Sequence, residues 1–130
     1  MNDNILIIEN EYSSVKIAFD TANTLCFDDK LHFKNISKAQ QLTGLDINSY
    51  SVIFVDISLA TNSTLDGFGI IEQFRLHHPD LMNRIVIITG NNKIKDAIKE
   101  HKLDSYNLTV LIKPVGFQEI EKTLKSKGVI

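Results

Sequence analysis

Short apolar runs recur along the chain, with enough residues between them for a helix. Four of these runs are residues 5–8, 52–55, 85–88 and 108–112. Continuous runs rich in β-branched residues indicate strands buried on both faces, as in a parallel sheet. Residues 31–34 alternate between apolar and polar side chains instead. This alternation predicts a strand with one wetter face, at an edge of the sheet.

Between the runs, the apolar spacing changes to about 3.6 residues, the repeat of an α-helix. This spacing predicts five helices. The first has the core face Val15, Ala18, Phe19, Ala22 and Leu25, and the second is a short helix over residues 37–42 with Ser37 as its N-cap. The third contains Phe68, Ile71 and Phe74 and is ended by Pro79, the fourth contains Ile94, Ala97, Ile98 and His101, and the fifth contains Phe117, Ile120 and Leu124 and ends near Gly128. Five strand–helix units joined by right-handed crossovers predict an α/β fold with a doubly wound five-stranded parallel sheet and helices on both faces. With residues 31–34 at an edge, the expected strand order is 2-1-3-4-5.

The composition fits one domain, expected to span residues 1–130. The chain has 130 residues, of which 43% are hydrophobic, enough for one core. A net charge of −2 gives no basic surface for direct binding to nucleic acid or to an anionic membrane, so a protein partner is expected. Cys26 is the single cysteine, and the first apolar run is too short for a signal peptide or a membrane span. We therefore expect a cytoplasmic protein.

Polar residues with complementary chemistry follow the predicted strands. In an open parallel sheet, ligands bind beyond the carboxyl ends of the strands. Four strands end in Glu9-Asn10-Glu11, Asp56, Thr89-Gly90 and Lys113-Pro114. A carboxylate can attack phosphorus to form an acyl phosphate, while Mg²⁺ on oxygen ligands, a hydroxyl and an ammonium group hold the phosphoryl oxygens. The set favours phosphoryl transfer.

The same residues resemble the markers of response-regulator receiver domains, the CheY-like family. The resemblance lies in the acidic residues after residues 5–8, in Asp56 at the end of its strand, in Asp66-Gly67, in Thr89-Gly90 and in Lys113-Pro114. All of them occur in the family's order, and together they cover essentially the whole chain. The resemblance implies a flavodoxin-like sheet and usually a cis peptide bond before Pro114.

Carried over position by position, the resemblance implies a role for each site residue. Asp56 would be the phosphoacceptor, Thr89 and Lys113 would hold the phosphoryl oxygens, and Glu9, Asn10, Asp56 and the backbone carbonyl of Ser58 would form the Mg²⁺ site. The chain would then be a two-component phosphorelay receiver that is phosphorylated by a histidine kinase or phosphotransfer protein and switches a protein-binding surface. It would not be an enzyme beyond its own phosphoryl transfer and dephosphorylation.

Three positions depart from the family's pattern. Asn10 replaces the acid that usually contacts Mg²⁺, so the metal should bind weakly. Leu59-Ala60 replaces the common apolar-Pro pair, and the loop before Asp66-Gly67 is longer than usual. Val110 stands where the family often has an aromatic residue that reports phosphorylation. We therefore expect a signal to travel through residues 89–102 instead.

Other interpretations of the same residues remain open. A receiver-like interaction module that works without phosphorylation is the main alternative, and Asn10 favours it. A flavin protein is disfavoured because the acidic Glu9-Asn10-Glu11 loop would repel phosphate. A haloacid-dehalogenase-type hydrolase would need an aspartate at Ser58. Thr89 could also serve as an ordinary N-cap of the helix that follows it.

Overall fold

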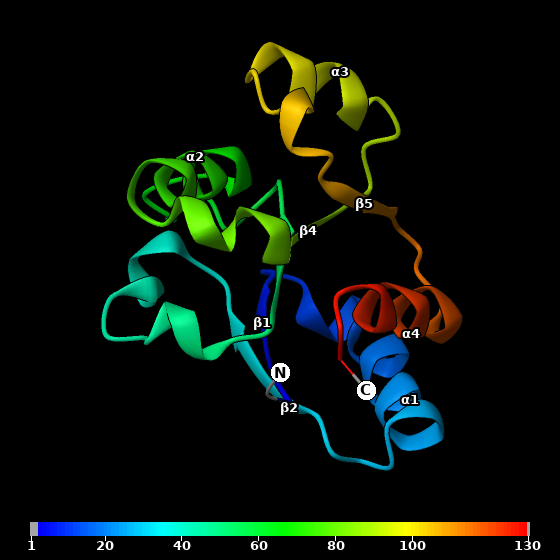
Figure 1. Ribbon diagram of the computed structural model, residues 1–130. Coiled ribbons are helices and arrows are strands. Elements are labelled where there is room, and N and C mark those ends of the chain that lie inside the picture. The colour runs from blue at the N-terminus through cyan, green and yellow to red at the C-terminus, as the bar shows by residue number, and fades with distance from the viewer. Residues whose placement is uncertain (1–2, 130) are drawn as a thin grey trace.

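The computed structural model describes residues 3–129 and has a five-stranded parallel sheet at its centre (Figure 1). The strands are β1 (Asn4–Ile8), β2 (His32–Ile36), β3 (Val52–Asp56), β4 (Ile85–Thr89) and β5 (Thr109–Ile112). Their order is β2-β1-β3-β4-β5, and every neighbouring pair is parallel. The predicted fold class and strand order are confirmed.

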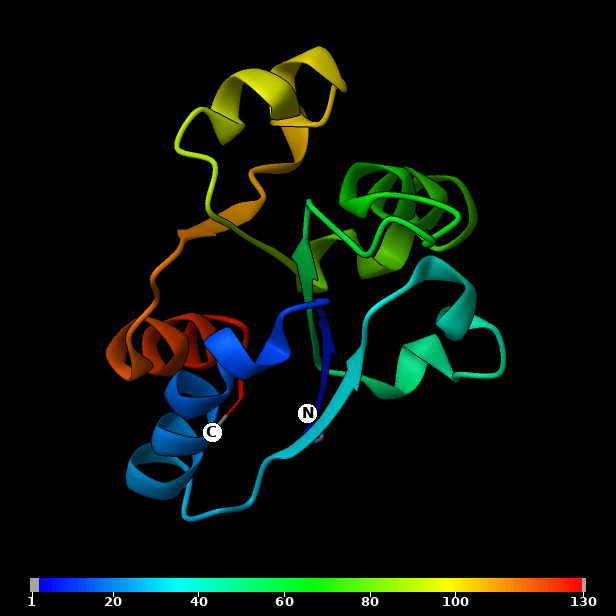
Figure 2. The same cartoon turned by 180° about the vertical axis from the view of Figure 1, so that it is seen from behind.

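Four α-helices cover the two faces of the sheet (Figures 1 and 2). They are α1 (Lys16–Cys26), α2 (Gly67–His77), α3 (Ile94–Glu100) and α4 (Phe117–Ser126). Helices α1 and α4 pack side by side on one face, while α2 and α3 share a hydrophobic cluster on the other. Shorter 3-10 helices lie at Tyr12–Ser14, Ala39–Leu42, Ile47–Ser49, Pro79–Arg84 and Asp104–Tyr106. No helix within residues 3–129 is long and apolar enough to cross a bilayer.

The central strands divide their side chains between two hydrophobic cores because successive residues of a strand point to opposite faces. On β1, Ile5 and Ile7 pack toward α1 and α4, whereas Leu6 and Ile8 pack toward α2 and α3. All four are completely buried. Burial of such a side chain stabilises the fold by about 1.5–3 kcal/mol, which explains why these strands read as unbroken apolar runs.

Strand β2 has the wetter face that its alternating sequence predicts. His32 and Lys34 are exposed, Phe33 and Asn35 are partly buried, and Ile36 is buried. The strand pairs only with β1, so it lies at the edge of the sheet as expected.

The predicted second helix is wrong. The connection between β2 and β3 contains two 3-10 helices and no α-helix, and Ser37 is not an N-cap. The Gln41 side chain accepts hydrogen bonds from the backbone N–H groups of Ser37 and Lys38 instead. Gly44 then takes a left-handed conformation with φ of +89°, which ends the turn before an α-helix can propagate.

The predicted position of Leu25 in the core is also wrong. Leu25 is 65% exposed, whereas Val15, Phe19 and Ala22 are buried. A helical face with the spacing 15, 19, 22 continues at residue 26, so Leu25 lies about 100° away from it. Cys26 accordingly packs against this core.

Candidate functional site

An open cavity of about 480 Å³ lies at the carboxyl ends of β1, β3, β4 and β5. Its lining residues are Asn10, Glu11, Asp56, Ser58, Leu59, Thr89, Gly90, Asn91 and Lys113. The parallel strands all end at this edge, which is why residues from four separate parts of the sequence meet there.

Asp56 is the last residue of β3 and is only 4% exposed. Its Oδ2 lies 3.2 Å from Lys113 Nζ, and its Oδ1 accepts a hydrogen bond from the Ser58 backbone N–H at 3.2 Å. Two donors therefore orient the carboxylate, while the cavity leaves it accessible to a small group.

Lys113 directly follows β5, and its backbone N–H donates to the Thr89 carbonyl at 2.8 Å. The peptide bond between Lys113 and Pro114 is cis, as the resemblance implies. The side chain is 20% exposed and turns inward to two carboxylates, those of Asp56 and Glu9.

Glu9 directly follows β1 and contacts Lys113. It is completely buried, and its Oε2 lies 2.7 Å from Lys113 Nζ. Its Oε1 accepts a hydrogen bond from the Glu11 backbone N–H at 3.0 Å. Glu9 is not among the residues that line the cavity. In this arrangement Glu9 positions the lysine, a contact that the sequence analysis did not foresee.

Burial and charge shift the protonation of this pair. Burial raises the pKa of Glu9 to about 7; the ion pair with Lys113 opposes the increase and the nearby Asp56 adds to it. Burial also works against the charge of Lys113, but the contacts with Glu9 and Asp56 outweigh it and the pKa of Lys113 is raised. Lys113 thus stays cationic at neutral pH, while Glu9 is close to its titration point.

Thr89 ends β4 and is 2% exposed. Its Oγ1 accepts a hydrogen bond from the Asn91 backbone N–H at 3.2 Å, and the Asn91 side chain accepts one from the Lys93 N–H at 2.9 Å. Helix α3 begins later, at Ile94, with Lys93 as its N-cap. The interpretation of Thr89 as the N-cap of that helix is therefore wrong.

Residues that carry oxygen atoms suited to a divalent cation line the cavity. Asn10 and Ser58 are exposed lining residues next to Asp56. Among residues 3–129, no group of three or more His, Cys, Asp or Glu side chains could hold a metal ion. A cation here would depend on one carboxylate together with amide and carbonyl oxygens, a donor set that suits Mg²⁺ but carries little charge.

The longer loop after β3 is held in place beside the cavity. Ser63 Oγ accepts a hydrogen bond from the Ala39 N–H at 2.8 Å, and Gln40 bonds both Asn62 O and Thr64 N–H. The loop therefore docks on the 3-10 helix Ala39–Leu42.

The sequence analysis named most of the residues at this edge but missed part of the lining. Leu59, Gly90 and Asn91, to which it gave no role in binding, also line the cavity. Each lies within three residues of a predicted site residue, so the loop that follows a strand end is the signal that could have found them. Val110 is partly buried against the α2 and α3 cluster.

No protein-family model matches the sequence, and a comparison with curated proteins finds no significant relative. Several solved structures have a fold similar to that of this chain. The receiver domain of NtrX from Brucella abortus has a TM-score of 0.68 at 21% identity, covering 95% of this chain and 96% of that one. The bacteriophytochrome response regulator AtBRR has a TM-score of 0.72 at 18% identity, covering 100% and 95%. A sensor protein from Polaromonas sp. JS666 has a TM-score of 0.71 at 19% identity, covering 98% and 96%. This chain has the fold of response-regulator receiver domains.

Proposed function

We propose that this chain is the receiver domain of a two-component phosphorelay and accepts a phosphoryl group on Asp56. The observation that carries the proposal is the placement of the Lys113 ammonium 3.2 Å from the Asp56 carboxylate, inside a cavity at the strand ends. The donor would be a phosphohistidine of a histidine kinase or of a phosphotransfer protein.

The proposed step is an in-line transfer. A carboxylate oxygen of Asp56 attacks the phosphorus atom, an O–P bond forms, and the P–N bond of the phosphohistidine breaks, leaving the electron pair on the imidazole, which takes up a proton. Lys113 compensates the negative charge on the phosphoryl oxygens. It is positioned for this by Glu9, 2.7 Å from its Nζ. Lys113 would thereby contact both the buried Glu9 and the phosphoryl group.

Thr89 supplies a hydrogen-bond donor to the same oxygens. Its hydroxyl oxygen already accepts from the Asn91 N–H, and a hydroxyl has one hydrogen to donate in addition. Because Thr89 lines the cavity, that hydrogen can point to a phosphoryl oxygen. The hydroxyl then contacts the group only in the phosphorylated state.

Oxygen ligands of this kind fit Mg²⁺, which would be held by Glu9, Asn10, Asp56 and the Ser58 carbonyl. The ion would neutralise charge on the phosphoryl group. Binding should be weak for two reasons: Asn10 is neutral, and the ammonium of Lys113 lies against the same carboxylate. Glu9 also contacts Lys113, which offsets the negative charge that Glu9 would offer to the ion.

The output should pass through residues 89–102. Val110 is too small to fill the space that a displaced Thr89 hydroxyl leaves, whereas Gly90 and the asparagines after it tolerate backbone change. The contact between the phosphoryl group and Thr89 distinguishes the two states. The surface switched would be that of α3 and its flanking loops.

The test is the intact mass of the protein after incubation with Mg²⁺ and a small phosphodonor such as acetyl phosphate. We expect the mass of one added phosphoryl group, lost in Asp56→Asn and retained in Asp96→Asn, an exposed carboxylate on α3. Uptake by Asp56→Asn would place the phosphoryl group elsewhere.

A receiver-like interaction module that works without phosphorylation is the second candidate. The neutral Asn10 and the orientation of Glu9 toward Lys113 favour it, since both reduce the charge available for Mg²⁺. Complete absence of uptake, also with a phosphorylated kinase or phosphotransfer protein, would support this candidate over the first.

A further inference from the structure

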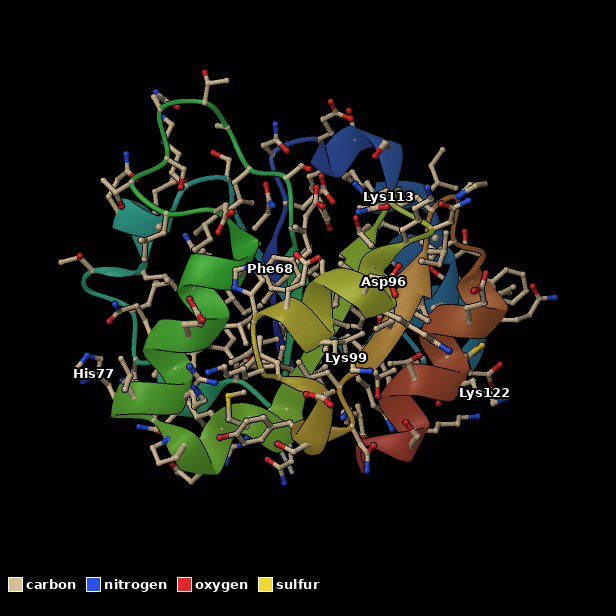
Figure 3. All side chains as sticks on the ribbon, turned by 90° about the horizontal axis from the view of Figure 1, so that it is seen from above. Phe68, His77, Asp96, Lys99, Lys113 and Lys122 are labelled. Carbon is tan, nitrogen blue, oxygen red and sulfur yellow. The ribbon has the colours of Figure 1, made fainter. Side chains whose placement is uncertain are left out.

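Phe68 and His101 form a stacked aromatic contact between two helices. Their ring centroids lie 4.2 Å apart and their planes are inclined by 11°. Phe68 is in the first turn of α2 and is 4% exposed, and His101 directly follows α3. Figure 3 shows Phe68 between α2 and α3. The stack therefore joins α2 to the C-terminal end of α3.

The Phe68 side of this contact is attached to the phosphoacceptor strand. The Gly67 N–H donates to the Ile57 carbonyl at 3.0 Å. A Cβ atom on Gly67 would lie 2.3 Å from the Asp56 carbonyl oxygen and 2.6 Å from Ile57 Cα. The first turn of α2 thus packs directly on the backbone of Asp56. A displacement of that backbone must be passed to Phe68, because a packed interior has no free volume to absorb it.

Polar contacts with Glu72 and Arg75 also attach the His101 side to α2. His101 Nδ1 lies 3.5 Å from Glu72 Oε1, and Arg75 Nη2 lies 3.7 Å from the same oxygen. Arg75 Nη1 also donates to the Lys102 carbonyl at 3.5 Å. The completely buried Leu103 fixes where the chain leaves the helix. These contacts hold the imidazole over the Phe68 ring.

The beginning of α3 is attached to the site by a different route. Thr89 Oγ1, the Asn91 side chain and the Lys93 N–H form a chain of hydrogen bonds that leads from the cavity to the N-cap of the helix. Helix α3 has only seven residues, from Ile94 to Glu100. Both of its ends are therefore connected to the edge that carries Asp56.

We propose that the stack of His101 on Phe68 is a mechanical link that transmits changes at Asp56 to the C-terminal end of α3, separately from the Thr89 route. The link consists of the Asp56 backbone, Gly67, Phe68 and His101. It rests on the proposed function only for the event that drives it, since the contacts exist without phosphorylation. It would serve in place of an aromatic residue at position 110 of β5, because the β-branched side chain of Val110 is short and restricted at χ1.

The test uses a perturbation that needs no phosphoryl group. Asp56→Asn is introduced into the wild type, into His101→Ala and into His101→Phe, and backbone amide chemical shifts are compared with and without it. In the wild type we expect shifts at residues 67–72 and at 98–103. In His101→Ala the shifts at 98–103 should disappear while those at 89–93 persist. In His101→Phe, which keeps a stacked ring without the contact to Glu72, they should return.

Two outcomes would overturn the proposal. The first is an equal response of residues 98–103 to Asp56→Asn with and without the His101 ring; the second is no response of these residues in the wild type. His77→Ala is the matched control, because His77 is exposed at the outer edge of α2 and stacks on no ring in the described part of the chain (Figure 3). It should leave the pattern unchanged.

Two further measurements separate the link from its driver. Amide hydrogen exchange in the unphosphorylated protein should become about tenfold faster at residues 98–103 in His101→Ala, the upper range for loss of one aromatic pair; unchanged exchange would contradict the link. Beryllofluoride with Mg²⁺ should shift residues 98–103 more in the wild type than in His101→Ala, where only the Thr89 route remains. If beryllofluoride shifts no residue of the cavity while the Asp56→Asn experiment succeeds, the proposed function fails and the link stands.

Discussion

Phe54 has no exposed surface, and Asp56, two residues further along β3, has 4%. The two side chains are buried to the same extent with opposite consequences. Phe54 packs edge-on against Phe19 of α1, with ring centroids 4.9 Å apart, and this burial stabilises the fold. Asp56 is paired with Lys113, which is also paired with the buried Glu9. Burial of charged groups costs free energy even when they are paired. Burial of apolar side chains in the middle of the sheet therefore stabilises the protein. Burial of charged side chains at its carboxyl edge lowers that stability.

The largest expected effect lies in the middle of the sheet. Phe54→Ala should reduce the free energy of unfolding by about 3–5 kcal/mol, because it removes buried contacts and leaves a cavity. Urea denaturation monitored by circular dichroism measures the change. Leu76→Ala is the control, since Leu76 is 68% exposed and should change stability by less than about 0.5 kcal/mol. Similar losses for both variants would contradict the assigned core.

Glu9 predicts how stability at the carboxyl edge depends on pH. Its pKa is raised from 4.5 to about 7 in the folded protein, so between these values the folded state keeps a proton that the unfolded state has lost. Stability should therefore fall as pH rises through this window, by about 3 kcal/mol in total. Denaturation at pH 4.5 to 8 in EDTA measures the profile.

Glu9→Gln isolates this contribution because it removes the titrating group. The variant should flatten the profile between pH 4.5 and 7, while Glu100→Gln, which alters an exposed carboxylate, should keep the wild-type profile. If Glu9→Gln keeps the full pH dependence, Glu9 is not the group responsible.

A smaller loss of stability is expected where the first residue of α2 packs against β3. Gly67→Ala would place a Cβ 2.3 Å from the Asp56 carbonyl oxygen, and backbone atoms cannot yield as a flexible side chain would. We expect the free energy of unfolding to fall by about 1–3 kcal/mol and the amide resonances of residues 56–58 to shift. Gly90→Ala is the control, since no atom lies within 4 Å of its Cβ position. Equal stability of the two variants would rule out the close packing of α2 on Asp56.

The smallest expected effect concerns the metal. Asn10→Asp adds one negative charge beside the proposed cation and should raise Mg²⁺ affinity about tenfold. Titration with Mg²⁺, monitored by the amide resonances of residues 56–58, gives the affinity. Asn92→Asp adds the same charge at an exposed residue that does not line the cavity and should change it little. An unchanged affinity in Asn10→Asp would remove Asn10 from the metal site.

The order of the strands and the polar residues that end them were predictable from the sequence alone. Runs such as residues 52–55 are apolar without interruption because both faces of a central strand are buried, and this requirement is local enough to be read from spacing. Asp56, Thr89 and Lys113 were predictable for a related reason: ligand sites of parallel sheets lie at the carboxyl ends of strands.

Only the tertiary structure decided which side chains meet. The Glu9 carboxylate lies 2.7 Å from the Lys113 ammonium, a contact between residues 104 positions apart (113 − 9) that no local pattern contains. Leu25 and the second crossover show the same limit, because a helical repeat also describes exposed faces and segments too short to propagate a helix. Periodicity determines which residues can be buried, and packing between distant segments determines which of them contact one another.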